Sequence, residues 1–205
     1  MTRVRVFRFA ALTFALAALC GCARSASVNY YMLRSMQGPL PQTKSCRPDR
    51  SLVVAVGPVT IAGYLDRPQI VTRSSPDTLQ FAEFDRWAEP LDKILARVVA
   101  DDLTALLGGA HVCVFPWPAS LPVRYQVTLN VVHLEKVPGG KVLLDANWNV
   151  LEHNGKKLLV MRRSTVSEPL AATAGFEEIA AAESRAVRTL SRRIAAVLET
   201  LRSQQ

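Results

Sequence analysis

The sequence is poor in the motifs from which catalytic and metal sites are usually built. Its three histidines, at positions 111, 133 and 153, lie on separate extended segments or in a predicted turn. It has no glycine-rich phosphate loop, no His-Glu-x-x-His, no Gly-x-Ser-x-Gly and no Cys-x-x-Cys. We therefore expect no catalytic residue, no metal ion and no cofactor.

Internal repeats and low-complexity segments are absent as well, and glycine and proline together make up about a tenth of the chain. Hydrophobic residues occupy 49% of the 205 positions, which excludes a disordered or collagen-like protein. The formal net charge is +8, and three of these charges are the arginines at positions 3, 5 and 8. The remaining excess fits an acidic partner or an anionic membrane surface, and equally a solvated face of the domain.

Residues 1–21 have the three-part layout of a secretory signal peptide. Three arginines come first, residues 9–19 form an apolar run, and a small residue precedes a cysteine. The run would rise only about 16 Å as a helix, about half of a bilayer's hydrocarbon core, so we do not expect it to remain as a membrane span. Secretion also excludes nucleic acid as a partner.

The segment Leu19-Cys20-Gly21-Cys22 resembles a bacterial lipobox, in which the peptide is cleaved before a lipidated cysteine. Gly21 supplies the small residue that cleavage before Cys22 requires, whereas Cys20 follows the bulky Leu19. We therefore predict acylation of Cys22, including palmitate, and a lipidated tether over residues 22–27. Ala23 instead of aspartate favours the periplasmic face of the outer membrane. The alternative is an ordinary signal peptide followed by an unmodified cysteine.

Residues 28–205 are expected to form a single α+β domain. A mostly antiparallel sheet should be covered on one face by two helices. Apolar periodicity predicts one helix from Pro90 to the glycines at 108 and 109, and another over residues 174–201. Alternation and turn signals predict strands over residues 28–33, 51–56, 69–82 (a hairpin), 111–115, 123–137, 141–151 and 158–166, the last three as a meander.

Four polar residues stand out against this pattern. Asp102 and Glu183 fall on the apolar sides of their helices, so each is expected to bond to backbone or to an arginine, or to lie where the apolar stripe reaches the surface. His133 and Asp145 could meet across the turn at residues 138–140. A cross-strand polar pair explains them better than a metal site or an acid–base pair.

Cys46 and Cys113 are the two thiols that remain once Cys22 is acylated and the signal peptide is removed. The envelope is oxidising, so we predict a disulfide between them if the segments that carry them are neighbours. Two free thiols remain an equally weighted alternative.

Residues 57–73 mix apolar, charged, glycine and proline residues in a way poorly suited to a buried strand. Aromatic and arginine residues inside a polar rim are typical of protein interfaces. The alternative is that Tyr64 and Leu65 close the end of the core. We hypothesise an interface for self-association or partner docking, made of Tyr64, Leu65, Arg67, Ile70, Arg73 and Trp87.

Several segments in succession resemble the PqiC-like auxiliary lipoproteins of MCE-type (mammalian cell entry) ABC transport systems. The likeness rests mainly on Leu65-x-Arg67-Pro68-x-Ile70-Val71 and on Arg86-Trp87-Ala88-x-Pro90-Leu91. The resemblance implies a non-enzymatic outer-membrane component that meets an MCE-domain protein during lipid trafficking across the envelope. A membrane-anchored periplasmic hydrolase, with a site not visible in the sequence, is the alternative.

Overall fold

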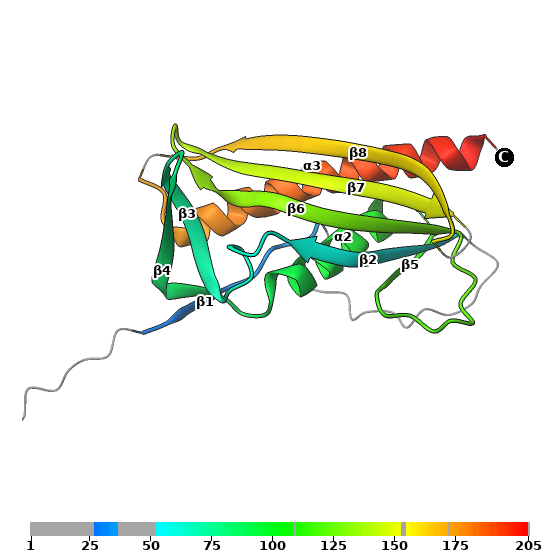
Figure 1. Ribbon diagram of the computed structural model, residues 1–205, viewed down its shortest axis with the longest axis horizontal. Coiled ribbons are helices and arrows are strands. Elements are labelled where there is room, and N and C mark those ends of the chain that lie inside the picture. The colour runs from blue at the N-terminus through cyan, green and yellow to red at the C-terminus, as the bar shows by residue number, and fades with distance from the viewer. Residues whose placement is uncertain (1–26, 37–51, 109, 153–154, 172, 205) are drawn as a thin grey trace, which may run out of the picture.

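The structure is a computed structural model that describes residues 27–36, 52–108, 110–152, 155–171 and 173–204. The described chain forms one sheet and two helices (Figure 1). The elements are β1 (Asn29–Tyr31), β2 (Val53–Ile61), β3 (Gln69–Ser75), β4 (Thr78–Trp87), α2 (Leu91–Leu106), β5 (His111–Val114), β6 (Tyr125–Val137), β7 (Lys141–Glu152), β8 (Lys157–Pro169) and α3 (Phe176–Ser203). Neither helix is long and apolar enough to cross a membrane.

Strand β6 is the centre of the sheet. One of its edges carries β7 and then β8, in antiparallel pairings that run the length of the strands. Its other edge is shared by two parallel partners, β2 along residues 125–131 and β3 at Lys136. Strand β5 continues the sheet beyond β2, while β4 and then β1 continue it beyond β3.

The predicted α+β class, the hairpin over β3 and β4, the meander over β6, β7 and β8, and both helices are confirmed. The sheet is mixed rather than purely antiparallel, because β2 pairs in parallel with both β5 and β6. Between β2 and β5 the chain forms β3, β4 and α2, and parallel neighbours require a long connection of this kind. Such pairings leave no turn signal in the sequence, unlike a hairpin.

Both helices cover the same face of the sheet. Helix α2 packs on β2 and β5, and α3 packs on β6, β7 and β8, so the face toward the viewer in Figure 1 is open. The largest fully buried side chains include Trp148 and Tyr125. Trp148 Nε1 donates to Ser164 Oγ (3.0 Å), and the Tyr125 hydroxyl donates to the Leu201 carbonyl (3.3 Å). Because their polar atoms are bonded, burial of each ring stabilises the fold by about 1.5–3 kcal/mol.

Strand β2 is longer than the predicted segment 51–56 and continues to Ile61. Its register against β6 shifts between Val56 and Val59. Gly57 lies at this irregularity with φ of +127°, and a Cβ there would lie only 2.6 Å from the Cβ of Phe115. Glycine therefore permits both the backbone conformation and the close approach of the segment that follows β5.

Candidate docking surfaces

A buried carboxylate, Glu135 of β6, holds together three segments of the chain. Arg73 of β3 donates to Glu135 Oε1 from Nε (3.1 Å) and Nη2 (3.0 Å). The Tyr64 hydroxyl and the Leu134 amide donate to Oε2 at 2.9 and 2.8 Å. His133 Nδ1 lies 3.1 Å from Oε1 and 3.0 Å from the Tyr64 hydroxyl. We call these four side chains, of Tyr64, Arg73, His133 and Glu135, the Glu135 cluster.

The charges within the Glu135 cluster stabilise one another. Burial, the carboxylate charge and the hydrogen bond to Glu135 raise the pKa of Tyr64 well above its usual range, so its hydroxyl remains a donor. Burial alone would lower the pKa of Arg73, but the bonds and charge of Glu135 outweigh it and raise that pKa. The cluster fastens β3 and the segment before it to β6, which is a structural role.

The structure corrects the predicted interface over residues 57–73. Leu65, Ile70 and Trp87 are buried in the core, so the prediction that they present an exposed apolar surface is wrong. Strand β3 is a sheet strand in which the adjacent residues Ile70 and Val71 are both buried, which the mixed composition of the segment did not indicate. Tyr64 and Arg73 are engaged in the Glu135 cluster.

Arg67 is the remaining member of the predicted interface, and it is partly exposed. Its Nε donates to the Tyr64 carbonyl (2.8 Å), and its guanidinium carbon lies 3.9 Å from the centre of the Phe81 ring. This cation–π contact places a positive charge against an aromatic ring at the surface. A docking role for this position stays a prediction.

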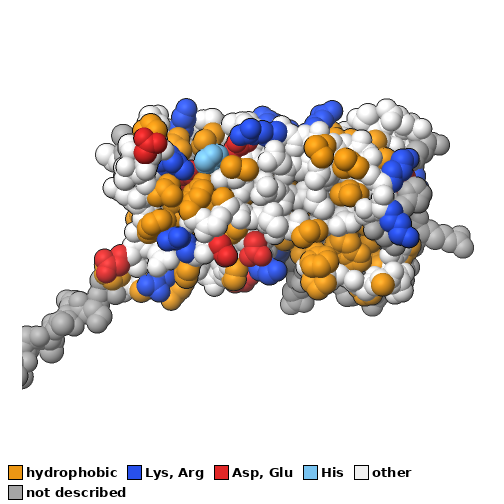
Figure 2. Space-filling view, in the orientation of Figure 1, with side chains coloured by type: hydrophobic (Ala, Val, Ile, Leu, Met, Phe, Trp, Pro, Cys, Tyr) orange, Lys and Arg blue, Asp and Glu red, His pale blue; other side chains and the backbone are white. Residues whose placement is uncertain are grey.

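The exposed large apolar side chains of the described chain fall into two groups. Tyr30, Phe81 and Phe84 lie on β1 and β4, which form one end of the molecule (Figure 1). We call this group the β1–β4 aromatic patch. The second group, Phe115, Leu158 and Met161, follows β5 or lies on the first half of β8, toward the other end. Figure 2 shows hydrophobic side chains gathered over β2 and β5 at that end, and mixed with charges at the β1 end.

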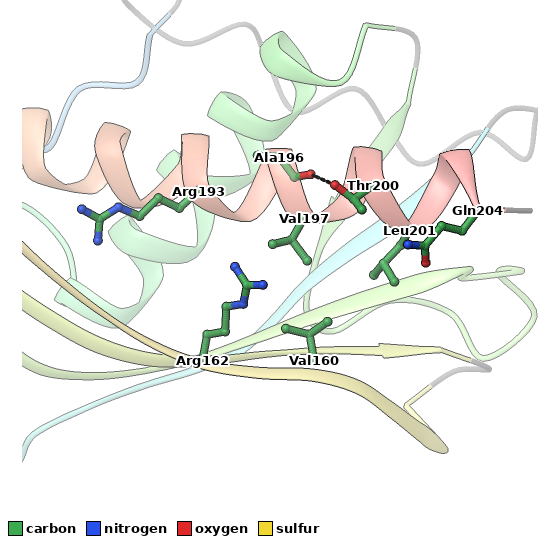
Figure 3. A pocket seen from close by; sticks show the side chains of 8 residues that line it. All are labelled: Val160, Arg162, Arg193, Ala196, Val197, Thr200, Leu201 and Gln204. Atoms are coloured by element: carbon green, nitrogen blue, oxygen red, sulfur yellow. Dashed lines mark hydrogen bonds between the residues drawn. The ribbon is translucent and has the colours of Figure 1, made fainter.

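A groove of about 480 Å³ separates β8 from the C-terminal half of α3 (Figure 3). We call it the β8–α3 groove. None of its lining residues is acidic, and the side chain of Arg162 forms no hydrogen bond or ion pair with another described residue. In Figure 3 the Arg162 side chain points from β8 toward α3, between Val160 and Arg193. The groove is lined by Val160, Arg162, Arg193, Ala196, Val197, Thr200, Leu201 and Gln204.

The outer edge of β8 is partly covered by side chains of α3. Arg193 Nη1 donates to the Thr165 carbonyl (3.1 Å), and Arg185 Nη2 donates to the Pro169 carbonyl (3.4 Å). These bonds lie on the second half of β8. Its first half, beside the groove, pairs only with β7 among the described strands, so its outer backbone groups are available for a further strand.

Two predicted cysteine sites lie outside the described residues, namely the lipid attachment at Cys22 and the position of Cys46. Cys113 is buried in β5, next to the central strand β2, and its thiol donates to the Val54 carbonyl (3.6 Å). The disulfide between Cys46 and Cys113 therefore stays a prediction.

His133 and Asp145 are cross-strand neighbours, as predicted. Asp145 is held by Arg163, through two nitrogens, and by the Thr165 hydroxyl (3.2 Å). The bonds from Arg163 lower the pKa of Asp145, although burial opposes them. His133 instead faces the Glu135 cluster. The described residues contain no group of three or more His, Cys, Asp or Glu side chains that could hold a metal ion.

Asp102 and Glu183 are both fully buried, but they differ in whether their carboxyl oxygens are hydrogen-bonded. Asp102 Oδ1 accepts a bond from the Met36 amide (2.7 Å), as predicted, while burial raises the pKa of Asp102. Neither carboxyl oxygen of Glu183 has a hydrogen-bond partner within the described ranges, so the prediction that it is bonded is wrong. Burial, and then the charge of Glu135, raise the pKa of Glu183 well above its usual value, which favours the neutral acid.

Known proteins resemble this chain in sequence and in fold. It is 28% identical over 171 residues to the intermembrane transport lipoprotein PqiC of Escherichia coli K12, covering 82% of this chain and 85% of the relative; PqiC of Shigella flexneri matches equally. A solved uncharacterised protein superposes with a TM-score of 0.69 at 19% identity, over 84% of this chain and 99% of that one. A solved protein from Xanthomonas campestris gives 0.65 at 18%, over 87% and 100%.

A match to a protein-family model shows which family the chain belongs to. The model described as "ABC-type transport auxiliary lipoprotein component" matches residues 31–195, from β1 to the second half of α3. The two solved structures show that the fold is shared. The chain therefore belongs to the family of PqiC-like auxiliary lipoproteins of ABC-type transport.

Proposed function

We propose that this chain is an outer-membrane lipoprotein that docks an MCE-domain protein of its own transport system during lipid trafficking. Family membership makes it an auxiliary component of transport rather than an enzyme. Two relatives are named intermembrane transport lipoproteins, which supports a role between membranes. A lipid on Cys22 would supply the anchor on the periplasmic face.

The observation that carries the proposal is the separation of the tether from the β8–α3 groove along the molecule. The described chain begins at Ser27, directly before β1, and the groove lies toward the opposite end (Figure 1). The five residues from Ala23 to Ser27 reach at most about 17 Å. An anchored Cys22 keeps the β1 end at the membrane, so the groove faces the periplasm, from which an envelope-spanning partner arrives.

The chemistry of the groove indicates what the partner would present. Val160, Val197 and Leu201 offer apolar contacts, and Arg162 offers a cation without a carboxylate. The neighbouring half of β8 offers backbone groups to an added strand. We therefore expect an extended segment of the MCE-domain protein, with apolar side chains and at least one carboxylate to pair with Arg162.

Co-purification tests this proposal. The full-length lipoprotein would be co-expressed with the MCE-domain protein of its transport system, and the complex recovered from mildly solubilised membranes. Arg162→Glu reverses the charge of the groove and should reduce recovery of the partner by at least tenfold, about 1.4 kcal/mol. Lys141→Glu is the matched control, because Lys141 is exposed at the start of β7, far from the groove along the strand. It should leave recovery unchanged.

Each failure has a distinct meaning. If the wild-type lipoprotein recovers no MCE-domain protein, the docking proposal is wrong. If Arg162→Glu recovers as much partner as the wild type, the partner binds elsewhere. Light scattering separates self-association, because a change of oligomeric state in Arg162→Glu without loss of the partner would make the groove a homo-oligomer interface.

The alternative, a periplasmic hydrolase, needs Asp102, Glu183 or His133 beside a nucleophile in an open cleft. Asp102 and Glu183 are fully buried, and the hydroxyl that interacts with Asp102 is that of Ser191. Ser191 is itself buried and donates to the Val187 carbonyl (3.0 Å). These positions do not support hydrolysis, and the family favours docking.

A further inference from the structure

The β1–β4 aromatic patch is more exposed than its residue types usually are. Tyr30, Phe81 and Phe84 are 65%, 46% and 38% exposed. Phenylalanine is among the residues most often buried, and single exposed apolar side chains need no explanation. Three aromatic side chains on two adjacent strands form a group, and a group of this kind marks a contact surface.

The pairing of β1 with β4 explains why the rings point outward. Tyr30 is the register partner of Arg86, and strand alternation places Phe84 on the same side as Arg86. The opposite side is occupied, because Asp85 accepts bonds from Asn29 Nδ2 (3.0 Å) and the Tyr31 hydroxyl (2.9 Å). The aromatic side has no such partner in the described chain.

An irregularity in β4 adds Phe81 to this surface. The register between β3 and β4 passes from Gln69 opposite Arg86 to Val71 opposite Phe81, so β4 has three more residues than β3 in this interval. Extra residues of this kind bend a strand and change where its side chains point. Phe81, stacked under Arg67, lies at one end of this interval, and Phe84 lies within it.

The charges around the patch are mixed. Arg67 and Arg86 lie beside the rings, and the acidic residues Glu83 and Asp85 lie at alternate positions of the same strand, β4, on its opposite side but close enough to offset the arginine charges. A surface of this composition has little net attraction for an anionic membrane. Its affinity must come from the rings, and aromatic side chains are favoured at the level of lipid headgroups.

We infer that the β1–β4 aromatic patch lies against the surface of the lipid bilayer, with Tyr30, Phe81 and Phe84 at the level of the headgroups. The inference extends the proposed anchoring at Cys22, since a tether of at most about 17 Å holds β1 next to the membrane. The lipid then provides attachment, and the rings orient the domain. The β8–α3 groove is directed away from the bilayer as a result.

Vesicle flotation of a chain without its lipid separates this contact from the anchor. Residues 23–205 would be used. The solved protein that superposes on 84% of this chain does so over 99% of its own length, so the fold forms there without a further domain. Phosphatidylcholine vesicles would be compared with 7:3 phosphatidylethanolamine–phosphatidylglycerol vesicles. The wild-type chain should float with both, and the combined variant Phe81→Ser, Phe84→Ser should partition at least tenfold less.

Phe115→Ser is the matched control, because Phe115 is 50% exposed but lies in the other apolar group. It should float as well as the wild type. Tyr30→Ser provides a second variant at the most exposed ring, and thermal unfolding verifies that all variants remain folded. Raising the salt concentration from 50 to 500 mM should change partitioning by less than twofold.

Three results would overturn the inference. The first is no flotation of the wild-type chain with either vesicle. The second is an equal loss in Phe115→Ser. The third is binding to vesicles that survives in the combined variant while the MCE-domain protein is lost, which would make the patch a protein interface. Acylation of Cys22 is measured separately by palmitate labelling, so failure of the anchor and failure of the patch can be distinguished.

Discussion

The two ends of the molecule differ in whether their arginine side chains are bonded within the chain. At the β1 end, Arg73 is bonded to a buried carboxylate and Arg67 is stacked on Phe81. In the β8–α3 groove, Arg162 points toward α3 without a carboxylate of its own. Both regions contain arginines, but the availability of their charges differs. An arginine becomes structural where the fold places a buried acid within reach, and it stays available for a partner where the fold does not.

The largest expected effect concerns which end is attached to the membrane. Cys22→Ser should abolish palmitate labelling and greatly weaken membrane attachment, because a domain contact alone is far weaker than a multiply acylated cysteine. Cys20→Ser should keep both. Fractionation and metabolic labelling are the measurements, and labelling that persists in Cys22→Ser or disappears in Cys20→Ser would contradict the assignment.

The next effect tests whether the β1 end is locked by the Glu135 cluster. Glu135→Ala removes the buried carboxylate that pairs with Arg73 and leaves the Tyr64 hydroxyl with the Val132 carbonyl as acceptor (2.9 Å), so unfolding by urea should show a loss of about 3–5 kcal/mol. The control Glu83→Ala, at an exposed position of β4, should change stability by less than about 0.5 kcal/mol. Equal effects would mean that the cluster contributes nothing specific.

A disulfide between Cys46 and Cys113 would likewise stabilise the region of β5. If Cys46 and Cys113 are bonded, Cys113→Ser should lower stability by about 2–4 kcal/mol, and alkylation under non-reducing denaturation should find neither thiol. Two reactive thiols in the wild-type protein would refute the bond.

Glu183 is a buried acid without a hydrogen-bond partner among the described residues, so we expect the stability of the fold to depend on pH. The pKa of Glu183 is raised in the folded state, so its contribution is fully present below the unfolded pKa of about 4.5 and is lost as pH rises toward the folded value. Glu183→Gln should therefore match the wild type near pH 4 and exceed it at higher pH, by about 1.4 kcal/mol per pH unit over that window. A stability difference that does not vary between pH 4 and pH 7 would contradict this.

The smallest expected effect is on stability, and it compares the partly exposed Arg67 with the exposed Arg162. Arg67→Glu should lower stability by about 0.5–1 kcal/mol, because it removes the stacking on Phe81. Arg162→Glu should leave stability unchanged within about 0.5 kcal/mol while reducing partner recovery. Thermal unfolding of both variants decides, and a larger loss in Arg162→Glu would show that Arg162 is structural after all.

Sequence reasoning found the elements whose signals are local. Pro90 directly precedes α2 and Gly108 follows it, and the turn signals at residues 138–140 and at Asn154-Gly155 fall in the sequence between the strands of the meander. The parallel pairing of β2 with β6 was not predictable, because its partners are about 70 residues apart and share no turn.

The candidate site was predictable only in part, for reasons of geometry. The register of β6 against β7 shifts between Val131 and His133, which changes the side of the sheet that the following residues face. Unbroken alternation from Tyr125 would place Glu135 on the same side of the sheet as Val131, whereas the shift places it on the other side, where Tyr64 and Arg73 bond it. The β8–α3 groove is formed by two elements remote in sequence, so no single segment indicated it.

The short strand β1 has a mechanical consequence. If the lipid holds Ser27 from one end and a partner pulls from the other, tension passes along the long axis and loads the three-residue pairing of β1 with β4 in shear. The chain beyond β1 is clasped to the helices by two bonds, from the Arg34 amide to Ser184 Oγ (3.0 Å) and from the Met36 amide to Asp102 Oδ1 (2.7 Å). The hydrogen bond to the buried Asp102 would therefore bear the tension once β1 has separated from β4.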